Sequence, residues 1–389
     1  MGLIRSEIDA LEDSPIVDVW RMGYGRPEVI GMYAGEPDVP TPDFICEAAA
    51  QAMREGKTFY TPNRGIIEVR QALIDYLRMI YGVEIPEDRI ALTASGMSAV
   101  MLIAQATVKA RDNVIAITPS WPNIMRAMQI CGAEPREVPM TAEADGWSLS
   151  LQSVFDACDE RTRVIYLASP GNPTGWMIGR AQAEELLAFA RARGIAILSD
   201  EVYHRLVYDG SDVAFSFHHI ARPDDPVFIV NSFSKAWAMT GWRLGWIVYP
   251  AGLREAFEKL IQFNTSGAPE FAQHGAIAAL RDGEDFVKFF AKRCAAGRDL
   301  VNARLGRMQR VRNVPNQGSF YAMFEVAGVT DTLTFCKRAV VEANIGLAPG
   351  MAFGRGAERH IRLCYAHSEA TLTVAMDRLE TFVAAYEET

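Results

Sequence analysis

The sequence has few cysteines, no long apolar run and no excess of positive charge, and each of these shortages excludes a class of protein. The 389 residues include 6 cysteines, and no two of them form a Cys-x-x-Cys pair. They are Cys46, Cys131, Cys158, Cys294, Cys336 and Cys364. Such scattered cysteines favour neither a zinc site nor a disulfide framework, and they are typical of reduced, mostly buried thiols.

Charge and hydrophobicity argue against nucleic-acid and membrane partners. The net charge is −9 and the isoelectric point is near 5.3, so the chain lacks the basic surface that binds nucleic acid or anionic lipid. No apolar run is long enough to span a membrane, and the N-terminal residues include Glu7 but no apolar core of signal-peptide length. We therefore expect a cytoplasmic protein with no nucleic-acid and no membrane partner.

The chain does have enough hydrophobic residues for a large core. They make up 49% of the sequence, and the length suggests two or three domains. From residue 89 onward, β-branched runs alternate with helical patterns, and turns rich in small or polar residues follow the strands. The strands are predicted at 89–92, 114–118, 163–167, 195–198 and 227–230. This layout predicts an open, mainly parallel α/β sheet with ligand groups at the strand ends.

Both ends of the chain differ from this alternating region. Residues 1 to about 45 show no clear period before a turn-rich Gly-Glu-Pro-Asp segment at 35–38. One helical stretch is predicted over about 252–281, followed by a long charged helix over about 285–305. The last hundred residues show an α+β pattern, which predicts a second domain.

A segment at 231–246 carries the clearest chemical signal. It reads Asn-Ser-Phe-Ser-Lys-Ala-Trp-Ala-Met-Thr-Gly-Trp-Arg-Leu-Gly-Trp. A lysine after a strand is usually a surface residue, but small and aromatic neighbours should desolvate Lys235 and lower its pKa, as reaction with an aldehyde requires. Ser232, Ser234 and Arg243 supply donors that suit a phosphate monoester. An aldehyde-reactive lysine beside a phosphate site indicates pyridoxal phosphate.

Several strand-end residues have an ordinary interpretation beside a functional one. The small-residue turn at 93–99 opens a helix and could bind phosphate through free N–H groups, although such turns are a weak signal. Trp121, between two prolines, could simply pack, and Asn-Pro-Thr-Gly at 172–175 could be an ordinary turn. Asp200 follows a strand and could be a helix cap.

Three residues outside the predicted strand ends have the same double interpretation. Gly35 lies in a segment that could be a linker, and Tyr60 could be a packing residue beside a turn. Arg362 lies within a predicted strand at 360–366, where arginine is usually on the solvent face. Each has a functional interpretation only in the context of the other motifs.

Together, these motifs resemble the class I/II aminotransferases of the fold-type I pyridoxal-phosphate enzymes, over nearly the whole chain. The similarity rests on Ser-x-Ser-Lys with Gly-Trp-Arg-Leu-Gly at 232–245, the motifs at 172–175 and 200–203, and Pro-Gly-x-x-Phe-Gly at 349–354. It implies a large domain with a mainly parallel seven-stranded sheet flanked by helices, plus a smaller α+β domain. The implied boundaries are an N-terminal segment at 1–45 that joins the small domain, a cofactor-binding domain at 46–285 and a small domain at 286–389.

The resemblance also implies how the cofactor is held. Ser95, Gly96 and Met97 would bind its phosphate together with Ser232, Ser234 and Arg243. Trp121 would stack on its ring, Asp200 would face the ring nitrogen, and Asn172 and Tyr203 would donate to its phenolic oxygen. Tyr60 would reach the phosphate in the neighbouring subunit, which requires a homodimer. The Thr118–Pro119 bond is expected to be cis.

The remaining implied roles concern the substrate and the reaction. Arg362 would bind the substrate α-carboxylate, with Gly35, Trp121 and Asn172 beside it, and Lys235, Asp200 and Tyr203 would be catalytic. The expected activity moves the amino group of an L-amino acid to a 2-oxo acid, commonly 2-oxoglutarate, by a ping-pong mechanism. An acidic-substrate branch of the family has lysine at the position of Met97, so methionine here argues against strict aspartate specificity.

Two other functions compete with this hypothesis. The same fold also supports C–S lyases and decarboxylases, because a fold does not determine a reaction. A cofactor-bearing DNA-binding regulator is the non-enzymatic alternative, and the acidic charge argues against it. Neutral or aromatic amino donors are favoured, while aspartate stays open through a cation from the neighbouring subunit.

Overall fold

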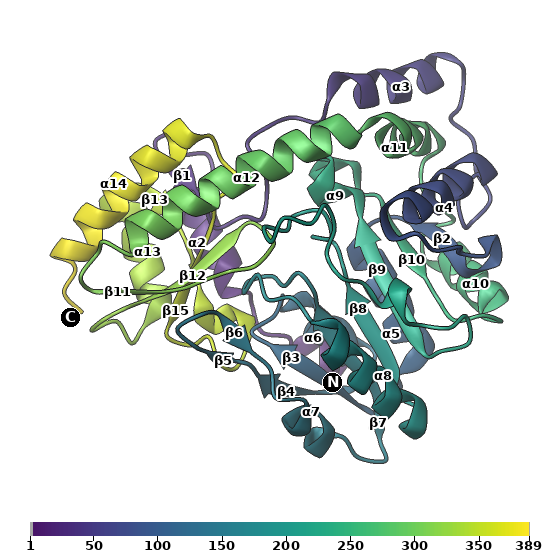
Figure 1. The fold of residues 1–389 in the computed structure, drawn as a ribbon, viewed down its shortest axis with the longest axis horizontal. Helices are drawn as coiled ribbons and strands as arrows, with labels where there is room; N and C mark the ends of the chain where they lie inside the picture. The colour runs from purple at the N-terminus through teal and green to yellow at the C-terminus, as the bar shows by residue number, and fades with distance from the viewer. Residues whose placement is uncertain (1–2, 389) are drawn as a thin grey trace.

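The computed structural model describes residues 3–388, and its largest feature is a seven-stranded sheet (Figure 1). In spatial order its strands are β2 (Ile90–Thr93), β10 (Gly245–Val248), β9 (Val227–Ser232), β8 (Ala196–Asp200), β7 (Thr162–Ala168), β3 (Asn113–Thr118) and β4 (Glu134–Pro139). Strand β10 runs antiparallel to both of its neighbours, and the other pairings are parallel. The predicted mainly parallel seven-stranded sheet is therefore confirmed.

Helices cover both faces of this sheet, which explains why its inner strands are apolar on both sides, whereas the edge strand β4 is largely polar. Successive side chains of a strand point to opposite faces, so Val114 and Ala116 join one apolar cluster while Ile115 and Ile117 join another. The first cluster contains α5 (Gly96–Thr107), α6 (Asn123–Ile130) and α10 (Arg254–Asn264). The second contains α4 (Ile67–Tyr81), α7 (Leu151–Ala157), α8 (Arg180–Arg193) and α11 (Glu270–Asp282).

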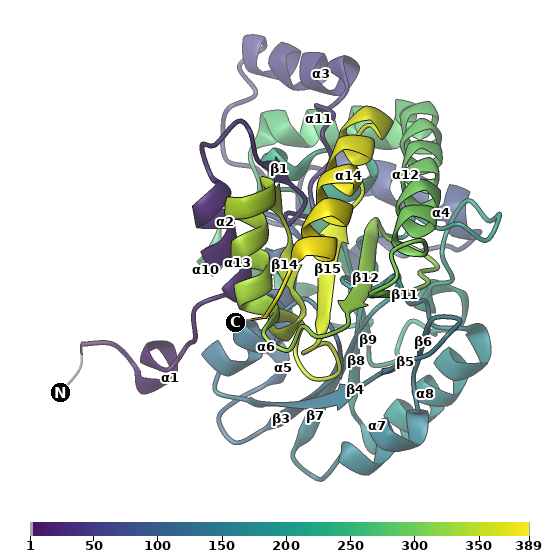
Figure 2. The ribbon, with the colours of Figure 1, turned by 90° about the vertical axis from the view of Figure 1, so that its left-hand side faces the viewer.

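A smaller antiparallel sheet stands beside the large one. Its order is β11 (Val311–Val314), β12 (Tyr321–Val326), β15 (His360–Cys364) and β14 (Ala348–Pro349). The helices α12 (Glu284–Leu305), α13 (Thr332–Ala343) and α14 (Glu369–Ala385) pack around it (Figure 2). Among the helices of residues 3–388, none combines the length and the apolar character that crossing a membrane would need.

The N-terminal segment packs on this smaller sheet. Helix α2 (Pro15–Gly23) lies against α13, as Figure 2 shows from the side. Strand β1 (Ile30–Gly31) pairs in parallel with β13 (Ile345–Gly346) (Figure 1). Helix α3 (Asp43–Arg54) then crosses to α11. The remaining short elements are α1 (Ser6–Asp9), α9 (Phe233–Ala236) and the hairpin of β5 (Thr141–Ala142) and β6 (Trp147–Ser148).

Two local features differ from the sequence-based expectation, and one agrees with it. The single helix expected over 252–281 is two helices, because Gly267 has a φ of +94° and Pro269 follows it. Helix α2 was not predicted, since no clear period was expected over residues 1 to about 45. The expected cis bond at Thr118–Pro119 is confirmed, and Ser169–Pro170 and Asn172–Pro173 are also cis.

Candidate functional site

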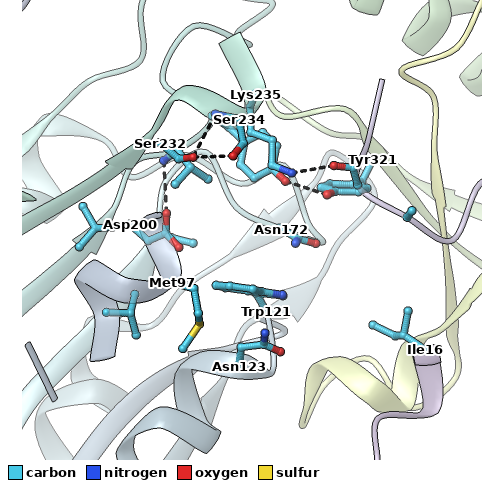
Figure 3. Close-up of a pocket in the computed structure, with 18 of the residues that line it drawn as sticks. Ile16, Met97, Trp121, Asn123, Asn172, Asp200, Ser232, Ser234, Lys235 and Tyr321 are labelled. Atoms are coloured by element: carbon cyan, nitrogen blue, oxygen red, sulfur yellow. Dashed lines mark hydrogen bonds between the residues drawn. The ribbon is translucent and has the colours of Figure 1, made fainter. Parts of the chain in front are cut away.

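A cavity of about 410 Å³ opens where the carboxyl ends of β7, β8 and β9 face the smaller sheet (Figure 3). This is the edge at which parallel α/β sheets bind ligands. Of the residues singled out from the sequence, twelve line the cavity: Gly35, Gly96, Met97, Trp121, Asn172, Asp200, Tyr203, Ser232, Ser234, Lys235, Arg243 and Arg362. Ser95 caps the adjoining helix α5, and Tyr60 lies elsewhere.

Lys235 reaches the cavity from the short helix α9, directly after β9. Its Nζ donates a hydrogen bond to the Gly35 carbonyl oxygen at 2.6 Å and lies 5.9 Å from the Tyr203 ring centroid. Loss of water around the amine lowers the pKa of Lys235 to about 8. A substantial fraction of the amine is therefore uncharged near neutral pH and able to attack an aldehyde.

Backbone and hydroxyl donors gather beside this lysine at the start of α5. Ser95 Oγ accepts from the Ser98 N–H at 3.0 Å, while Ser232 Oγ donates to Ser234 Oγ at 2.8 Å. A Cβ built on Gly96 would lie 3.4 Å from the Ser232 Cβ, so the two turns are in contact. Free N–H groups at a helix start and adjacent hydroxyls suit an anion such as phosphate.

Arg243 adds a cation to this group. Its backbone has a left-handed φ of +53°, and its Nη1 donates to the Thr240 carbonyl oxygen at 2.8 Å. That contact uses one guanidinium donor and leaves others directed at the cavity, which Arg243 lines. The hydroxyls, helix start and guanidinium together fit a bound phosphate monoester.

Asp200 is a buried carboxylate at the end of β8. Its Oδ1 accepts from the Val202 N–H at 3.2 Å, and the Tyr166 hydroxyl donates to its Oδ2 at 3.5 Å. Burial raises the pKa of Asp200 to about 6, and within residues 3–388 it makes no ion pair. The ordinary helix-cap interpretation is wrong, because turns and not a helix follow β8, and the Val202 contact lies within such a turn. A buried carboxylate at a cavity wall suits a protonated ring nitrogen.

Arg362 is buried rather than on the solvent face, contrary to the usual location of arginine in a strand. Its side chain is only 3% exposed, and it lies between the rings of Tyr321 and Phe353, at 4.3 Å and 4.7 Å. Its Nη1 donates to Asn172 Oδ1 at 2.9 Å. Its Nη2 donates to the Tyr33 carbonyl oxygen. Because each terminal nitrogen carries two N–H groups, the guanidinium keeps donors for a carboxylate ligand at the cavity that it lines.

Gly35 lies in the turn-rich segment after β1, which contacts Lys235 on the side of the large sheet and Tyr321 of the smaller sheet. A Cβ at this position would lie 1.9 Å from the Tyr321 hydroxyl oxygen, which no side chain could tolerate. Glycine is therefore required here because of a neighbouring tyrosine that the sequence did not reveal. The expected place of Gly35 beside the substrate carboxylate stays a prediction.

Tyr60 lies outside the cavity of its own chain. Its side chain is 93% exposed, and residues 58–61 face residues 265–269 across a surface hollow. The neighbouring Phe59 is also 79% exposed. Large exposed aromatic side chains of this kind mark an interaction surface.

Sequence reasoning missed several residues that line the cavity: Ile16, Tyr33, Asn123, Tyr166 and Tyr321. For Tyr166 a signal existed, because a tyrosine inside an apolar strand needs a hydrogen-bond partner for its hydroxyl. Ile16 lies in a segment without a period, and Tyr321 looks like any strand residue. Met97 and Trp121, in contrast, border the cavity as expected (Figure 3).

Comparison with known proteins agrees with this geometry. The family model "Aminotransferase class I and II" matches residues 27–379. A probable aspartate/prephenate aminotransferase of Aquifex aeolicus is 33% identical over 91% of this chain and 90% of its own length. An aromatic-amino-acid aminotransferase of Thermococcus litoralis is 30% identical over 97% of both chains. The structure of an alanine aminotransferase from Pyrococcus furiosus superposes with a TM-score of 0.91 at 27% identity, covering 98% of this chain and 100% of that one.

Proposed function

Because the chain belongs to the class I and II aminotransferases and is a pyridoxal-phosphate-dependent enzyme, we propose that it takes the amino group of neutral or aromatic L-amino acids. 2-Oxoglutarate is the proposed acceptor, in a ping-pong reaction. The observation that carries the substrate class is the set of cations at the cavity. Within residues 3–388, the cations that line it are Lys235, Arg243 and Arg362.

Each of these three cations already has a proposed use, so none of them remains for a second substrate carboxylate within the same subunit. Lys235 is assigned to the cofactor aldehyde and to proton transfer, Arg243 to the phosphate and Arg362 to the α-carboxylate. The remaining wall near Trp121 includes Met97, Val100 and Ile16, which are apolar. Apolar walls favour an apolar side chain by the area removed from water.

The polar group available to the distal carboxylate of glutamate is Asn123, which is exposed and also lines the cavity. An amide donor there binds a carboxylate more weakly than a cation does, but it lets the cavity accept both apolar amino acids and glutamate. The related proteins carry names that include aspartate, prephenate and aromatic amino acids, so the family itself permits either class.

The residues around the cavity suit pyridoxal phosphate. We assign the phosphate to Ser95, Gly96, Met97, Ser232, Ser234 and Arg243. Trp121 would lie on the ring face, Asp200 at the ring nitrogen, and Asn172 and Tyr203 at the phenolic oxygen. When bound, the cofactor supplies an aldehyde for amines and a ring that accepts electrons released at the substrate α-carbon.

The chain's own groups then orient the substrate and move its proton. Arg362 binds the α-carboxylate through two parallel hydrogen bonds, with Gly35 and Asn172 beside it, and this turns the α-hydrogen toward Lys235. Lys235 Nζ takes that proton as a general base and later returns a proton as a general acid. Its lowered pKa near 8 suits both roles near neutral pH.

A half-reaction screen tests the substrate class. Each amino acid is added to the purified holoenzyme without an acceptor, and the visible absorbance of the bound cofactor is followed. Phenylalanine, tyrosine or alanine should convert the cofactor to its aminated form faster than aspartate does, and 2-oxoglutarate should restore the starting spectrum. Faster conversion by aspartate would contradict the neutral class. Pyruvate or carbon dioxide released without an aminated cofactor would instead indicate a lyase or decarboxylase.

We also propose that the enzyme acts as a homodimer in which Tyr60 completes the site of the neighbouring subunit. The support is that Tyr60 is 93% exposed and outside the cavity of its own chain. A hydrogen bond from its hydroxyl to a phosphate would contribute about 1.5–3 kcal/mol, so its loss should lower activity about 10- to 150-fold.

Hybrid dimers test this arrangement. Tyr60→Ala and Lys235→Ala subunits with different affinity tags are co-expressed, and the doubly tagged dimers are purified. Each homodimer of a variant should be nearly inactive, whereas the hybrid should recover about half of the wild-type activity, because one of its two sites is complete. A hybrid no more active than the Tyr60→Ala homodimer would show that Tyr60 acts within its own subunit.

A further inference from the structure

Tyr321 lies at a junction that none of the roles above explains. It is the first residue of β12 in the smaller sheet, its side chain is buried, and it lines the cavity beside Lys235 (Figure 3). Its hydroxyl oxygen is 2.7 Å from that of Tyr203, and the Arg362 guanidinium lies over its ring at 4.3 Å. Tyr321 therefore contacts both the group assigned to the cofactor's phenolic oxygen and the group assigned to the substrate carboxylate.

The direction of the Tyr203–Tyr321 hydrogen bond follows from proton counting. Each phenol has a single proton, so if Tyr203 donates to the cofactor, Tyr321 must donate to the Tyr203 oxygen. Within residues 3–388 the Tyr321 hydroxyl has no other hydrogen-bond partner, and the Gly35 backbone packs directly against it. The Tyr321 hydroxyl is thus enclosed, and its acceptor is the Tyr203 oxygen. A phenol that accepts one hydrogen bond becomes a stronger donor, so Tyr203 donates more strongly to the cofactor.

The charge above the ring acts on the same hydroxyl. A cation over an aromatic face stabilises negative charge on the phenol oxygen, so Arg362 strengthens Tyr321 as a donor. The other titratable or charged groups near Tyr321 are Cys364 of β15, Asp200 at the end of β8, Tyr203 and Lys235 of α9. Arg362 and Lys235 are the cations of this group, and Arg362 is the one that lies over the Tyr321 ring and is assigned to the substrate carboxylate.

We propose that Tyr321 is a positioning residue that couples the carboxylate site at Arg362 to the cofactor's phenolic oxygen through Tyr203. Its ring supports the guanidinium, and its hydroxyl polarises the Tyr203 hydroxyl. Binding of a substrate carboxylate neutralises the charge of Arg362 and so weakens the hydrogen bonds from Tyr321 to Tyr203 and from Tyr203 to the cofactor's phenolic oxygen. The negative charge on that oxygen is then less stabilised, so the nearby Lys235 nitrogen keeps its proton to a higher pH. This inference rests on the roles proposed above for Tyr203 and Arg362.

Two variants separate the two contacts of Tyr321. Tyr321→Phe keeps the ring under Arg362 and removes the hydroxyl, so the pH midpoint of the holoenzyme's visible absorbance change should rise by about 0.5–1 unit. The KM for the amino donor should stay within about twofold. Tyr321→Leu also removes the ring, and KM should then rise about three- to tenfold through loss of the cation–π contact.

Tyr208→Phe is the matched control, because Tyr208 also has an arginine over its ring, Arg298 at 4.5 Å, and also donates to a nearby oxygen, the Ser319 carbonyl. Tyr208 does not line the cavity, so its variant should keep the wild-type midpoint and KM. Equal midpoint shifts in Tyr208→Phe and Tyr321→Phe would reduce the role of Tyr321 to packing.

Other outcomes also decide the proposal. An unchanged midpoint in Tyr321→Phe would overturn it, and a lowered midpoint would show that Tyr203 donates to Tyr321 instead. If the wild-type holoenzyme had no visible band that responds to amino acids, the proposed function would itself fail, and this inference with it. If the wild-type band responds to amino acids and Tyr321→Phe has the wild-type pH midpoint, the role of Tyr321 is refuted while the proposed function stands.

Discussion

Replacing Lys235 with alanine should abolish transamination. The variant would lose the amine proposed to attack the cofactor aldehyde and to carry the substrate α-proton, and proton transfer alone is worth about 10²–10⁴-fold in rate. We therefore expect kcat to fall by at least that factor with the best donor found in the half-reaction screen. The measurement is steady-state transamination, together with the visible spectrum of the purified variant mixed with pyridoxal phosphate.

Lys259→Ala is the control for this experiment. The Lys259 side chain is 67% exposed, and its contact with Glu255 at 3.9 Å is a surface ion pair of small energetic value. This variant should keep wild-type kcat, KM and spectrum. Turnover by Lys235→Ala within about tenfold of the wild-type rate would refute the assignment of Lys235 as the catalytic amine.

Replacing Arg362 with lysine should have the second-largest effect, although the charge is conserved. A lysine ammonium cannot make two parallel hydrogen bonds to a carboxylate, cannot keep the contact with Asn172 in the same plane and packs poorly between Tyr321 and Phe353. Weakening a buried charged pair costs about 2–5 kcal/mol, which predicts a fall in kcat/KM of about 30- to 5000-fold. Most of this loss should be seen as a raised KM for the amino acid.

Arg312→Lys serves as the matched control, because Arg312 lies in β11 of the same smaller sheet and its side chain is 54% exposed. Its replacement should leave both kinetic constants near wild type. A KM for Arg362→Lys within about threefold of wild type would show that the substrate carboxylate binds elsewhere. Arg243 would then be the next cation at the cavity to examine.

Much of the site could be predicted because it is built from strand ends. Asn172, Asp200 and Lys235 are far apart in the sequence, yet each follows a strand that the hydrophobic pattern predicts. In a parallel sheet the carboxyl ends of neighbouring strands meet at one edge, so local motifs imply a common location. The burial that lowers the pKa of Lys235 could also be predicted, because it follows from the small and aromatic residues next to Lys235 in the sequence.

The contacts made by the smaller sheet could not be predicted in this way. Arg362 is in the middle of β15, where the two faces of a strand are equivalent until something packs on one of them. Whether its side chain faces solvent or the cavity depends on Phe353 and Tyr321, which come from other elements of the chain. Helix α2 was missed because its helical form depends on packing against α13 more than on its own nine residues.

The amino-acid sequence by itself determined the family and the mainly parallel sheet, and it led to the lysine that we propose as the reacting amine, because these depend on local motifs and on residue periodicity. Only the tertiary structure decided which side chains meet across the two sheets: Tyr321 with Tyr203, Arg362 with Asn172, and Gly35 with Lys235. It also left Tyr60 outside the cavity of its own chain. The physical reason is that these contacts join residues of high sequence separation, and they exist only once both sheets have packed together.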